Sequence, residues 1–293
     1  MPTINAEPSR SVVLRSGALG DSILTLPLIR QLSDLGPVTV LTRDAYFPIL
    51  RGMLPSLDLL SIDSAMAATL FHSPDKFWES VFDGASVYSF LNDQKGNLQE
   101  NLRQLGMGTY HQLPSRTKKT PHIVEQMFSL AGLALPTDLL KTSQLTHLRI
   151  DVGTHFWIHP GSGSTSKNTP LERLRQAYES DSYKLPILAS FGEADHDLLN
   201  DFKKTFADLD YTLVMPATIA DLLAKLAEKA AIFLGNDSGP THLSAALGIP
   251  TIVSYCSTDP AIWKPLGLDV TIKRNVRDNP EGRTDLGHSS PRI

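Results

Sequence analysis

The chain has 293 residues, of which 41% are hydrophobic and 20% are charged, a balance typical of a globular protein with a sizeable core. Its net charge at pH 7 is −4, so no basic excess supports nucleic-acid binding. The single cysteine, Cys256, excludes a disulfide within the chain and is typical of a reducing compartment. We find no apolar run of transmembrane length and no apolar signal region at the start, and therefore expect a cytoplasmic protein.

The first half of the chain alternates short apolar strands with helical patterns, which favours an α/β unit with a parallel sheet. Residues 92–119 are polar and basic, and we expect a helix followed by a loop there. A further helix should follow Asp21, with Pro27 near its first turns, where proline is least harmful. Strands are expected at residues 11–15, 37–41, 57–62 and 86–90, and helices at 22–32, 45–53 and 122–131.

The second half restarts the same rhythm, so we expect two domains, residues 1–148 and 149–293. From residue 275 the sequence lacks an apolar pattern, which predicts a mobile tail. Two such domains facing each other leave a cleft between the carboxyl ends of their strands, where ligands bind in this class. Strands are expected at residues 154–159, 185–191, 211–215, 231–234, 250–255 and 270–273, and helices at 171–178, 195–206, 219–229 and after residue 239.

A turn at residues 15–21 follows a strand and opens a helix, as a dinucleotide-binding turn does. It lacks both the G-x-G-x-x-G spacing and the G-x-x-x-x-G-K-[ST] spacing of a P-loop, so the two commonest nucleotide motifs are excluded. The turn presents one carboxylate, Asp21, at the carboxyl end of the strand. Asp21 is either a helix cap or a general base.

The loop at residues 159–167 crowds glycine, serine and threonine after a strand and ends at Lys167. Backbone and hydroxyl donors beside a positive charge make a composition that suits a phosphate. The alternative is a solvated Ser/Gly loop.

The stretch at residues 233–247 ends a strand, turns, and opens a helix with small residues. Residues 236–238 lie where N-caps are chosen, and Gly235 and Gly239 allow close backbone approach. A helix N-terminus suits a phosphate, and His242, on the same helix face as Gly239, could donate to a phosphate oxygen. The alternatives are an ordinary strand-to-helix cap and a structural histidine.

Two Asp-x-Asp pairs could suggest a metal-linked nucleotide-sugar site. Both lie on or beside a predicted surface helix, and we expect solvated carboxylates instead. The pairs are Asp195 with Asp197 and Asp208 with Asp210.

Taken in order, the three stretches resemble the family-9 glycosyltransferases, which include the bacterial lipopolysaccharide heptosyltransferases. One departure is that the family's lysine is usually followed by an aromatic-proline pair, whereas Asn168-Thr169-Pro170 keeps only the proline. The matching motifs are Leu-Gly-Asp at 19–21, T-x-P-x-[IL]-R at 25–30, His-Pro-Gly-Ser-Gly at 159–163 with Lys167, the Gly-Asn-Asp-Ser-Gly-Pro-x-His-Leu-x-Ala-Ala stretch at 235–246 with Gly-x-Pro at 248–250, and Thr-Asp-Pro at 258–260 with Trp263 and Pro265.

This resemblance implies a GT-B architecture, in which two Rossmann-like domains with parallel sheets face each other across a cleft. It implies a nucleotide sugar, ADP-heptose above all, held mostly by the second domain, and a lipopolysaccharide-core or related glycan or glycolipid acceptor on the first. The reaction would be inverting single displacement without a metal or cofactor. Any contact with the inner membrane would be peripheral, through the acceptor.

Position by position, the resemblance makes Asp21 the general base that deprotonates the acceptor hydroxyl. The other positions would hold the donor. Its diphosphate would meet Lys167, Ser162, Gly163, the N–H groups of Ser238 and Gly239, and the His242 side chain. Asp237 would bind the sugar hydroxyls, Glu193 the ribose, and Thr218 would lie near the nucleobase. Fixed donors, a lysine and a helix N-terminus can stabilise a departing diphosphate without a metal.

Two other functions stay open. The lost aromatic residue and a short C-terminal segment would fit a catalytically silent protein that binds nucleotide sugars. A Rossmann-type oxidoreductase would bind NAD, but the missing glycine fingerprint disfavours it.

Overall fold

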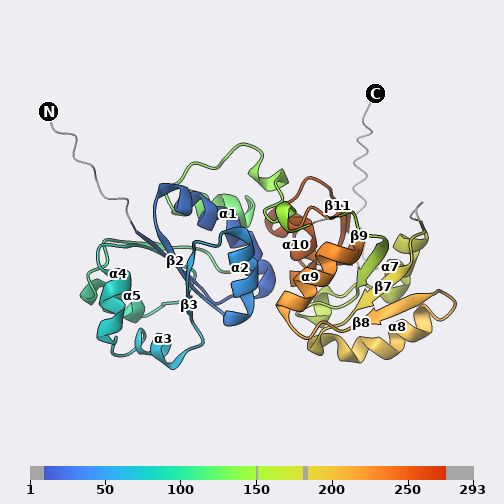
Figure 1. Cartoon of the computed structure of the whole chain (residues 1–293), viewed down its shortest axis with the longest axis horizontal. Coiled ribbons are helices and arrows are strands. Elements are labelled where there is room, and N and C mark those ends of the chain that lie inside the picture. The colour runs from blue at the N-terminus through green and yellow to red at the C-terminus, as the bar shows by residue number, and fades with distance from the viewer. Residues whose placement is uncertain (1–9, 150, 181–183, 275–293) are drawn as a thin grey trace, which may run out of the picture.

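The computed structural model describes residues 10–149, 151–180 and 184–274, so the predicted tail lies outside the described residues. Two α/β halves lie side by side, with α1 and α2 of the first half facing α9 and α10 of the second (Figure 1). Each half holds one parallel sheet, and the prediction of two Rossmann-like domains is confirmed.

The first sheet has five strands in the order β3-β2-β1-β4-β5. Its central strands, β1 and β2, are buried throughout and rich in valine, as expected for strands covered on both faces. The strands are β1 (Ser11–Arg15), β2 (Val38–Thr42), β3 (Asp58–Ser61), β4 (Ser86–Ser89) and β5 (Thr109–Gln112). The helices are α1 (Leu19–Leu35), α2 (Phe47–Met53), α3 (Ala65–Thr69), α4 (Glu79–Phe82), α5 (Asn97–Gln104) and α6 (Ile123–Leu130), with 3-10 turns η1 (Asp44–Tyr46), η2 (Lys76–Trp78), η3 (Leu139–Lys141) and η4 (Thr146–Leu148).

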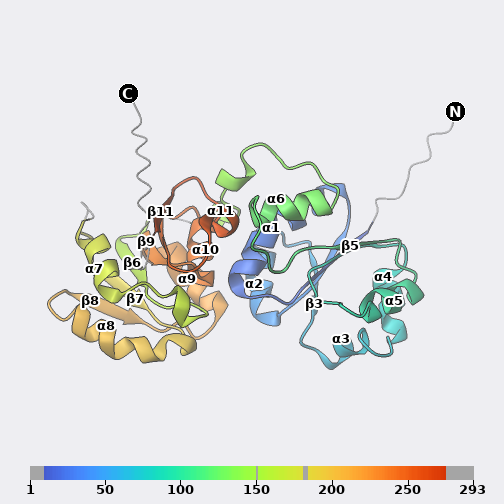
Figure 2. The same cartoon turned by 180° about the vertical axis from the view of Figure 1, so that it is seen from behind.

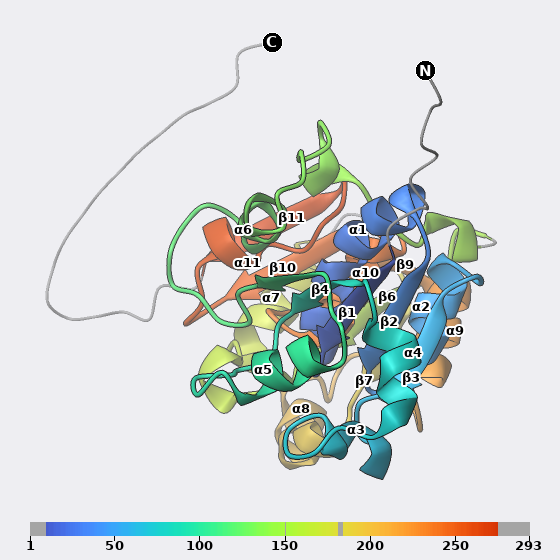
Figure 3. The same cartoon turned by 90° about the vertical axis from the view of Figure 1, so that its left-hand side faces the viewer.

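The second sheet has six strands in the order β8-β7-β6-β9-β10-β11, the 3-2-1-4-5-6 order of dinucleotide-binding sheets. In Figure 3 it lies behind the first sheet. The strands are β6 (His155–His159), β7 (Ile187–Ser190), β8 (Tyr211–Val214), β9 (Ala230–Asn236), β10 (Thr251–Tyr255) and β11 (Val270–Arg274). The helices are α7 (Leu171–Glu179), α8 (Leu199–Thr205), α9 (Ile219–Lys229), α10 (Gly239–Ala246) and α11 (Pro260–Trp263), with 3-10 turns η5 (Thr165–Lys167) and η6 (Glu193–Leu198).

The structure corrects two local predictions. The polar region at 92–119 contains α5 and then β5, an edge strand paired only with β4, so its polar residues gave no apolar alternation to read. Helix α1 begins at Leu19 rather than after Asp21. Pro27 therefore lies in the middle of α1, and Asp21 lies in its first turn.

The two halves meet through α1 and α10, which lie at the centre of the molecule from the front and from behind (Figures 1 and 2). Two glycines permit the contact. A Cβ on Gly20 would lie 2.9 Å from His242 Cδ2, and one on Gly239 would lie 2.7 Å from Leu19 Cβ. One buried apolar cluster continues from α1 through α10 to β9. The contact places the first turn of α1 against the first turn of α10.

Residues just before β6 already belong to the packing of the second half. Leu145 N donates to Ala246 O, and Arg149 donates to the carbonyls of Ala230 and Gly248. A boundary after residue 148 stays a prediction. Within the described ranges, no helix is both long and apolar enough to span a membrane.

Candidate active site

A cleft of about 870 Å³ opens between the halves, at the carboxyl ends of β1, β6, β7 and β9. In the second sheet, two of the loops that line the cleft follow the neighbouring strands β6 and β9. The strand order reverses between these two strands, and a crevice is expected there. The first half contributes Ala18, Leu19 and residues around η1 and the start of α2. The second half contributes His159, Ser162, Gly163, 190–195, 216–220, Leu222 and 238–240.

A neighbouring hollow of about 1020 Å³ lies wholly on the first half. It is lined by Arg15, Asp21 and the segments 90–94 and 112–116. Ala18 lines both spaces, so they adjoin at the N-terminus of α1. This arrangement offers one space for each of two substrates.

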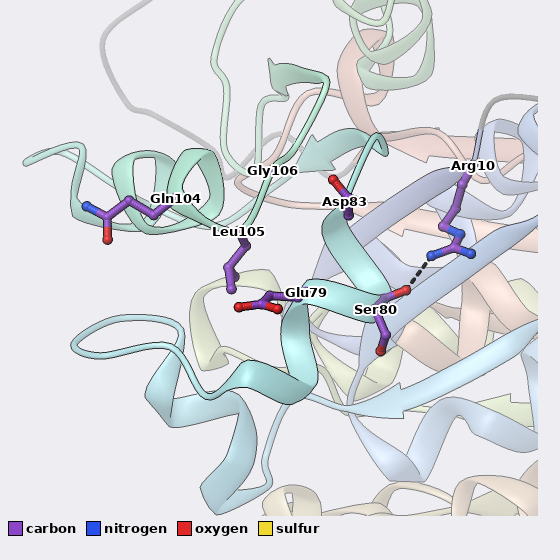
Figure 4. A pocket seen from close by; sticks show the side chains of 7 residues that line it. All are labelled: Arg10, Glu79, Ser80, Asp83, Gln104, Leu105 and Gly106. Carbon is purple, nitrogen blue, oxygen red and sulfur yellow. Dashed lines mark hydrogen bonds between the residues drawn. The ribbon is translucent and has the colours of Figure 1, made fainter.

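A third hollow lies at the other end of β1, between Arg10, α4 and the end of α5 (Figure 4). It is lined by polar residues such as Glu79 and Asp83, and Arg10 donates to Ser80 O there. None of the predicted site residues lines it.

Asp21 serves as a cap and still faces the first-half hollow. Its Oδ2 accepts a hydrogen bond from Ala18 N at 3.0 Å. Its Oδ1 lies 3.3 Å from Arg15 Nη2, and the side chain remains 27% exposed. The capping bond therefore leaves the carboxylate accessible to a hydroxyl group in the hollow.

Lys167 and Asp237, which come from two of the predicted stretches, form an ion pair. Lys167 Nζ lies 2.8 Å from Asp237 Oδ2, and Thr258 Oγ1 donates to the same oxygen at 2.7 Å. His242 Nε2 lies 3.4 Å from Asp237 Oδ1. Burial alone would raise the pKa of Asp237, but the hydrogen bonds and charges of His242 and Lys167 outweigh it and hold the pKa well below its usual range. Asp237 is thus an ionised anchor for three donors.

The serine of the His-Pro-Gly-Ser-Gly loop makes its contacts within that loop. Ser162 Oγ lies 2.6 Å from Ser164 O and 2.7 Å from Asn168 Oδ1. Gly163 is exposed, and a Cβ there would meet no described atom within 4 Å. A Cβ on Gly161 would instead lie 1.8 Å from Asp195 Oδ1, so Gly161 is the glycine that the packing demands.

The prediction that Asp195 is solvated is wrong. Asp195 is buried, its Oδ2 accepts from Gly192 N at 3.1 Å, and the same oxygen lies 3.5 Å from His159 Nε2. Burial lowers the pKa of His159, and the charge of Asp195 opposes that effect. The carboxylate turns inward because it closes the turn after β7. The other three aspartates are exposed, as expected: Asp197, Asp208 and Asp210.

Glu193 and Thr218 lie on one wall of the cleft. Glu193 is exposed at the start of η6, and its carboxylate has no hydrogen-bond partner in the described part of the chain. Thr218 caps α9, because its Oγ1 accepts from Asp221 N at 3.1 Å. Asp195 lies on the same wall, but its carboxylate turns inward, so Glu193 is the exposed carboxylate of the two.

The N-terminus of α10 lines the cleft through Ser238 and Gly239. Ser238 Oγ lies 3.0 Å from Thr241 Oγ1 and makes no side-chain cap bond to the backbone. His242 is 4% exposed and does not line the cleft; it packs between Asp237 and Gly20. The structure thus brings Ser238 and Gly239 to the cleft and withdraws His242 behind them.

The sequence interpretation gave no role to Thr258 or Arg15. Thr258 was visible only as part of a motif, and Arg15 only as the end of a strand. Among residues 10–149, 151–180 and 184–274, no group of three or more His, Cys, Asp or Glu side chains is placed to hold a metal ion.

Residues 158–285 match the model of glycosyltransferase family 9 (heptosyltransferase). This match covers 128 of the 293 residues and lies within the second half of the chain. A curated protein of Haemophilus influenzae, described as a candidate glycosyltransferase, is 29% identical over 123 residues, or 38% of this chain and 34% of that protein. The match therefore spans about a third of that relative's length.

Solved structures of glycosyltransferases share the fold over both halves of the chain. A family-9 glycosyltransferase from Veillonella parvula gives a TM-score of 0.70 at 14% identity, covering 94% of this chain and 90% of its own. The E. coli heptosyltransferase WaaC with ADP gives 0.64 at 17%, covering 90% and 93%. E. coli ADP-heptose lipopolysaccharide heptosyltransferase II gives 0.63 at 17%, covering 92% and 91%. The predicted GT-B fold class is confirmed.

Proposed function

We propose that this chain transfers a sugar from a nucleotide-diphosphate donor to a hydroxyl group of a glycan or glycolipid. The donor is ADP-heptose, and the acceptor belongs to the lipopolysaccharide core or a related glycan. Transfer is an inverting single displacement that needs no metal. Supporting observations are the family-9 domain and the ADP ligands named for the structurally similar WaaC. The protein acts in the cytoplasm and meets the inner membrane peripherally, through its acceptor.

One observation carries the proposal: the first turn of α1, which holds Asp21, packs against the first turn of α10. The donor occupies the cleft, with its diphosphate at Ser162, Gly163, Ser238 and Gly239 and at the charge of Lys167. The acceptor occupies the adjoining hollow. Asp21 accepts the hydroxyl proton while the oxygen attacks the anomeric carbon, and the nucleoside diphosphate leaves.

The remaining donor contacts follow from the walls of the cleft. Glu193 binds the ribose hydroxyls, and the turn at Thr218 lies against the nucleobase. Asp237 is buried and does not line the cleft, so its contact with the sugar hydroxyls requires the donor to draw Lys167 away from it. His242 does not touch the donor; it contacts Asp237 and so helps to hold that carboxylate in place.

Incubation with ADP-heptose and a heptose-free lipopolysaccharide-core glycolipid tests the proposal. We expect ADP release coupled to product formation, an anomeric configuration opposite to that of the donor, and unchanged rates in EDTA. Retained configuration or loss of activity in EDTA would contradict the mechanism.

A catalytically silent nucleotide-sugar-binding protein is the second candidate. It is favoured by the ion pair that already engages Lys167, because a donor diphosphate must compete with Asp237 for that charge. Tight ADP-heptose binding without ADP release, across a panel of acceptors, would favour this function.

A further inference from the structure

Arg15, the last residue of β1, carries its charge into the interior beside the first-half hollow. Its side chain is only 2% exposed. Charged side chains are almost never fully buried unless they are paired, and arginine stays protonated in proteins. A full positive charge therefore lies under the acceptor space, and its partners decide what it does.

The partners of Arg15 are few. Nη2 lies 3.3 Å from Asp21 Oδ1, and Cζ lies 4.3 Å from the centroid of the Phe90 ring. Nε and Nη1 are buried and meet no hydrogen-bond partner among the described residues. Burial lowers the pKa of Arg15, and the charge of Asp21 opposes that effect. Such a costly buried cation calls for an explanation beyond packing.

The geometry points to Arg15 as the positioning residue for Asp21, an inference that rests on the proposed role of Asp21 as base. Arg15 holds Oδ1 and the Ala18 N–H holds Oδ2, so the two contacts fix the plane of the carboxylate. The Phe90 ring and the buried end of β1 fix the guanidinium in turn. The base therefore meets the acceptor hydroxyl in one orientation.

Two effects of Arg15 on the base oppose each other. A neighbouring positive charge weakens a carboxylate as a base, because proton uptake leaves the cation unpaired. A misplaced catalytic group, however, costs about 100-fold in rate for a displacement of about 1 Å. Orientation of the carboxylate outweighs the loss of basicity, so removing Arg15 slows turnover.

The test compares Arg15→Met, Arg15→Lys, Asp21→Asn and the double variant Arg15→Met/Asp21→Asn. The readouts are kcat and the KM for ADP-heptose, with the heptose-free core glycolipid as acceptor and with water alone as acceptor. Arg15→Met should lower kcat about 100-fold with the donor KM within about twofold. Arg15→Lys keeps the charge without the fork of donors and should lose about tenfold.

Arg10→Met is the matched control. Arg10 precedes β1 at the opposite end, where it reaches Ser80 O, away from both substrate spaces (Figure 4). Its turnover should stay within about twofold of the wild type. A circular dichroism spectrum and a urea midpoint for each variant identify any that fail to fold; in that event Arg15→Lys carries the comparison.

The double variant separates positioning from a structural role. If Arg15 acts through Asp21, adding Arg15→Met to Asp21→Asn should cost no more than about twofold. Losses that multiply would overturn the inference, as would an Arg15→Met enzyme as fast as or faster than the wild type. Wild-type turnover in Asp21→Asn would show instead that Asp21 is not the base. The proposed function, rather than the role of Arg15 alone, would then be wrong.

Discussion

At the scale of single residues, the proposed function makes the ion pair of Lys167 and Asp237 the point where the donor diphosphate competes for a charge. Asp237 is almost wholly buried and Lys167 is about one-third exposed, so the lysine can turn toward the cleft while the carboxylate stays. Thr258 and His242 also contact Asp237, so the carboxylate would keep two partners if Lys167 turned away. We infer that Asp237 binds and positions Lys167 when no donor is present.

Lys167→Met should weaken ADP binding about 10- to 100-fold, because a charge-assisted hydrogen bond to a phosphate contributes about 1.5–3 kcal/mol. Isothermal titration with ADP measures the change. Lys184→Met is the control and should bind ADP as the wild type does, because Lys184 lies over the Tyr178 ring near the end of α7 and lines neither the cleft nor the first-half hollow. Equal affinity in Lys167→Met would show that this lysine does not reach the diphosphate.

Asp237 also makes stability depend on pH. Its folded pKa is depressed, so its contribution is present above its unfolded value of about 3.9 and is lost as the pH falls toward the folded pKa. Asp237→Asn should lower the free energy of unfolding by about 1.5–3 kcal/mol at pH 7. Urea titrations should show that difference shrinking below about pH 4. A difference that grows in acid would contradict the assigned direction.

At the scale of elements, the approach of α1 to α10 depends on glycine for a reason that the sequence could not show. Gly239 was predicted to serve a turn or a ligand. In the structure its missing Cβ admits Leu19, a residue 220 positions away. The motif identified the glycine, but only the fold identifies its partner.

Gly239→Ala should push α10 from α1 and destabilise the protein by about 1–3 kcal/mol, the usual effect of overpacking. Turnover should fall further than nucleotide affinity, because the base moves relative to the donor. Gly163→Ala serves as the control for stability, since open space surrounds that position and about 0.5 kcal/mol is the expected limit. Equal unfolding midpoints for the two variants would refute the steric argument.

Asp195 and β5 show where sequence patterns fail. Asp195 belongs to an Asp-x-Asp pair whose pattern predicts solvent-exposed carboxylates. In the structure, the turn after β7 folds the Asp195 carboxylate inward against Gly161 and His159. Strand β5 has one partner strand and polar residues, so nothing in its pattern marks a strand. Both depend on contacts between segments far apart in the chain.

At the scale of the whole molecule, the sequence predicted the two-sheet fold because the buried strands carry unbroken apolar runs. It also predicted that loops after strands would carry the site, since parallel strands end at one edge. It could not predict that α1 and α10 pack directly, which brings the loops of both halves to one cleft.

Ligand binding should stabilise the chain in the order that the proposed donor dictates. At 100 times its dissociation constant a ligand adds about 2.7 kcal/mol to the free energy of unfolding. ADP and ADP-heptose should therefore raise the melting temperature, and NAD should not. A shift with NAD alone would favour the oxidoreductase that the missing glycine fingerprint argued against.

The proposed reaction depends most directly on Asp21, which lines the first-half hollow and accepts a hydrogen bond from Ala18, the residue that lines both spaces. Single-turnover transfer from ADP-heptose should fall about 100- to 10,000-fold in Asp21→Asn, while ADP affinity changes by less than about threefold. Asp34→Asn, an exposed aspartate on the same helix, is the control and should transfer at the wild-type rate. Undiminished transfer in Asp21→Asn would contradict the assignment of the base and the split site built around it.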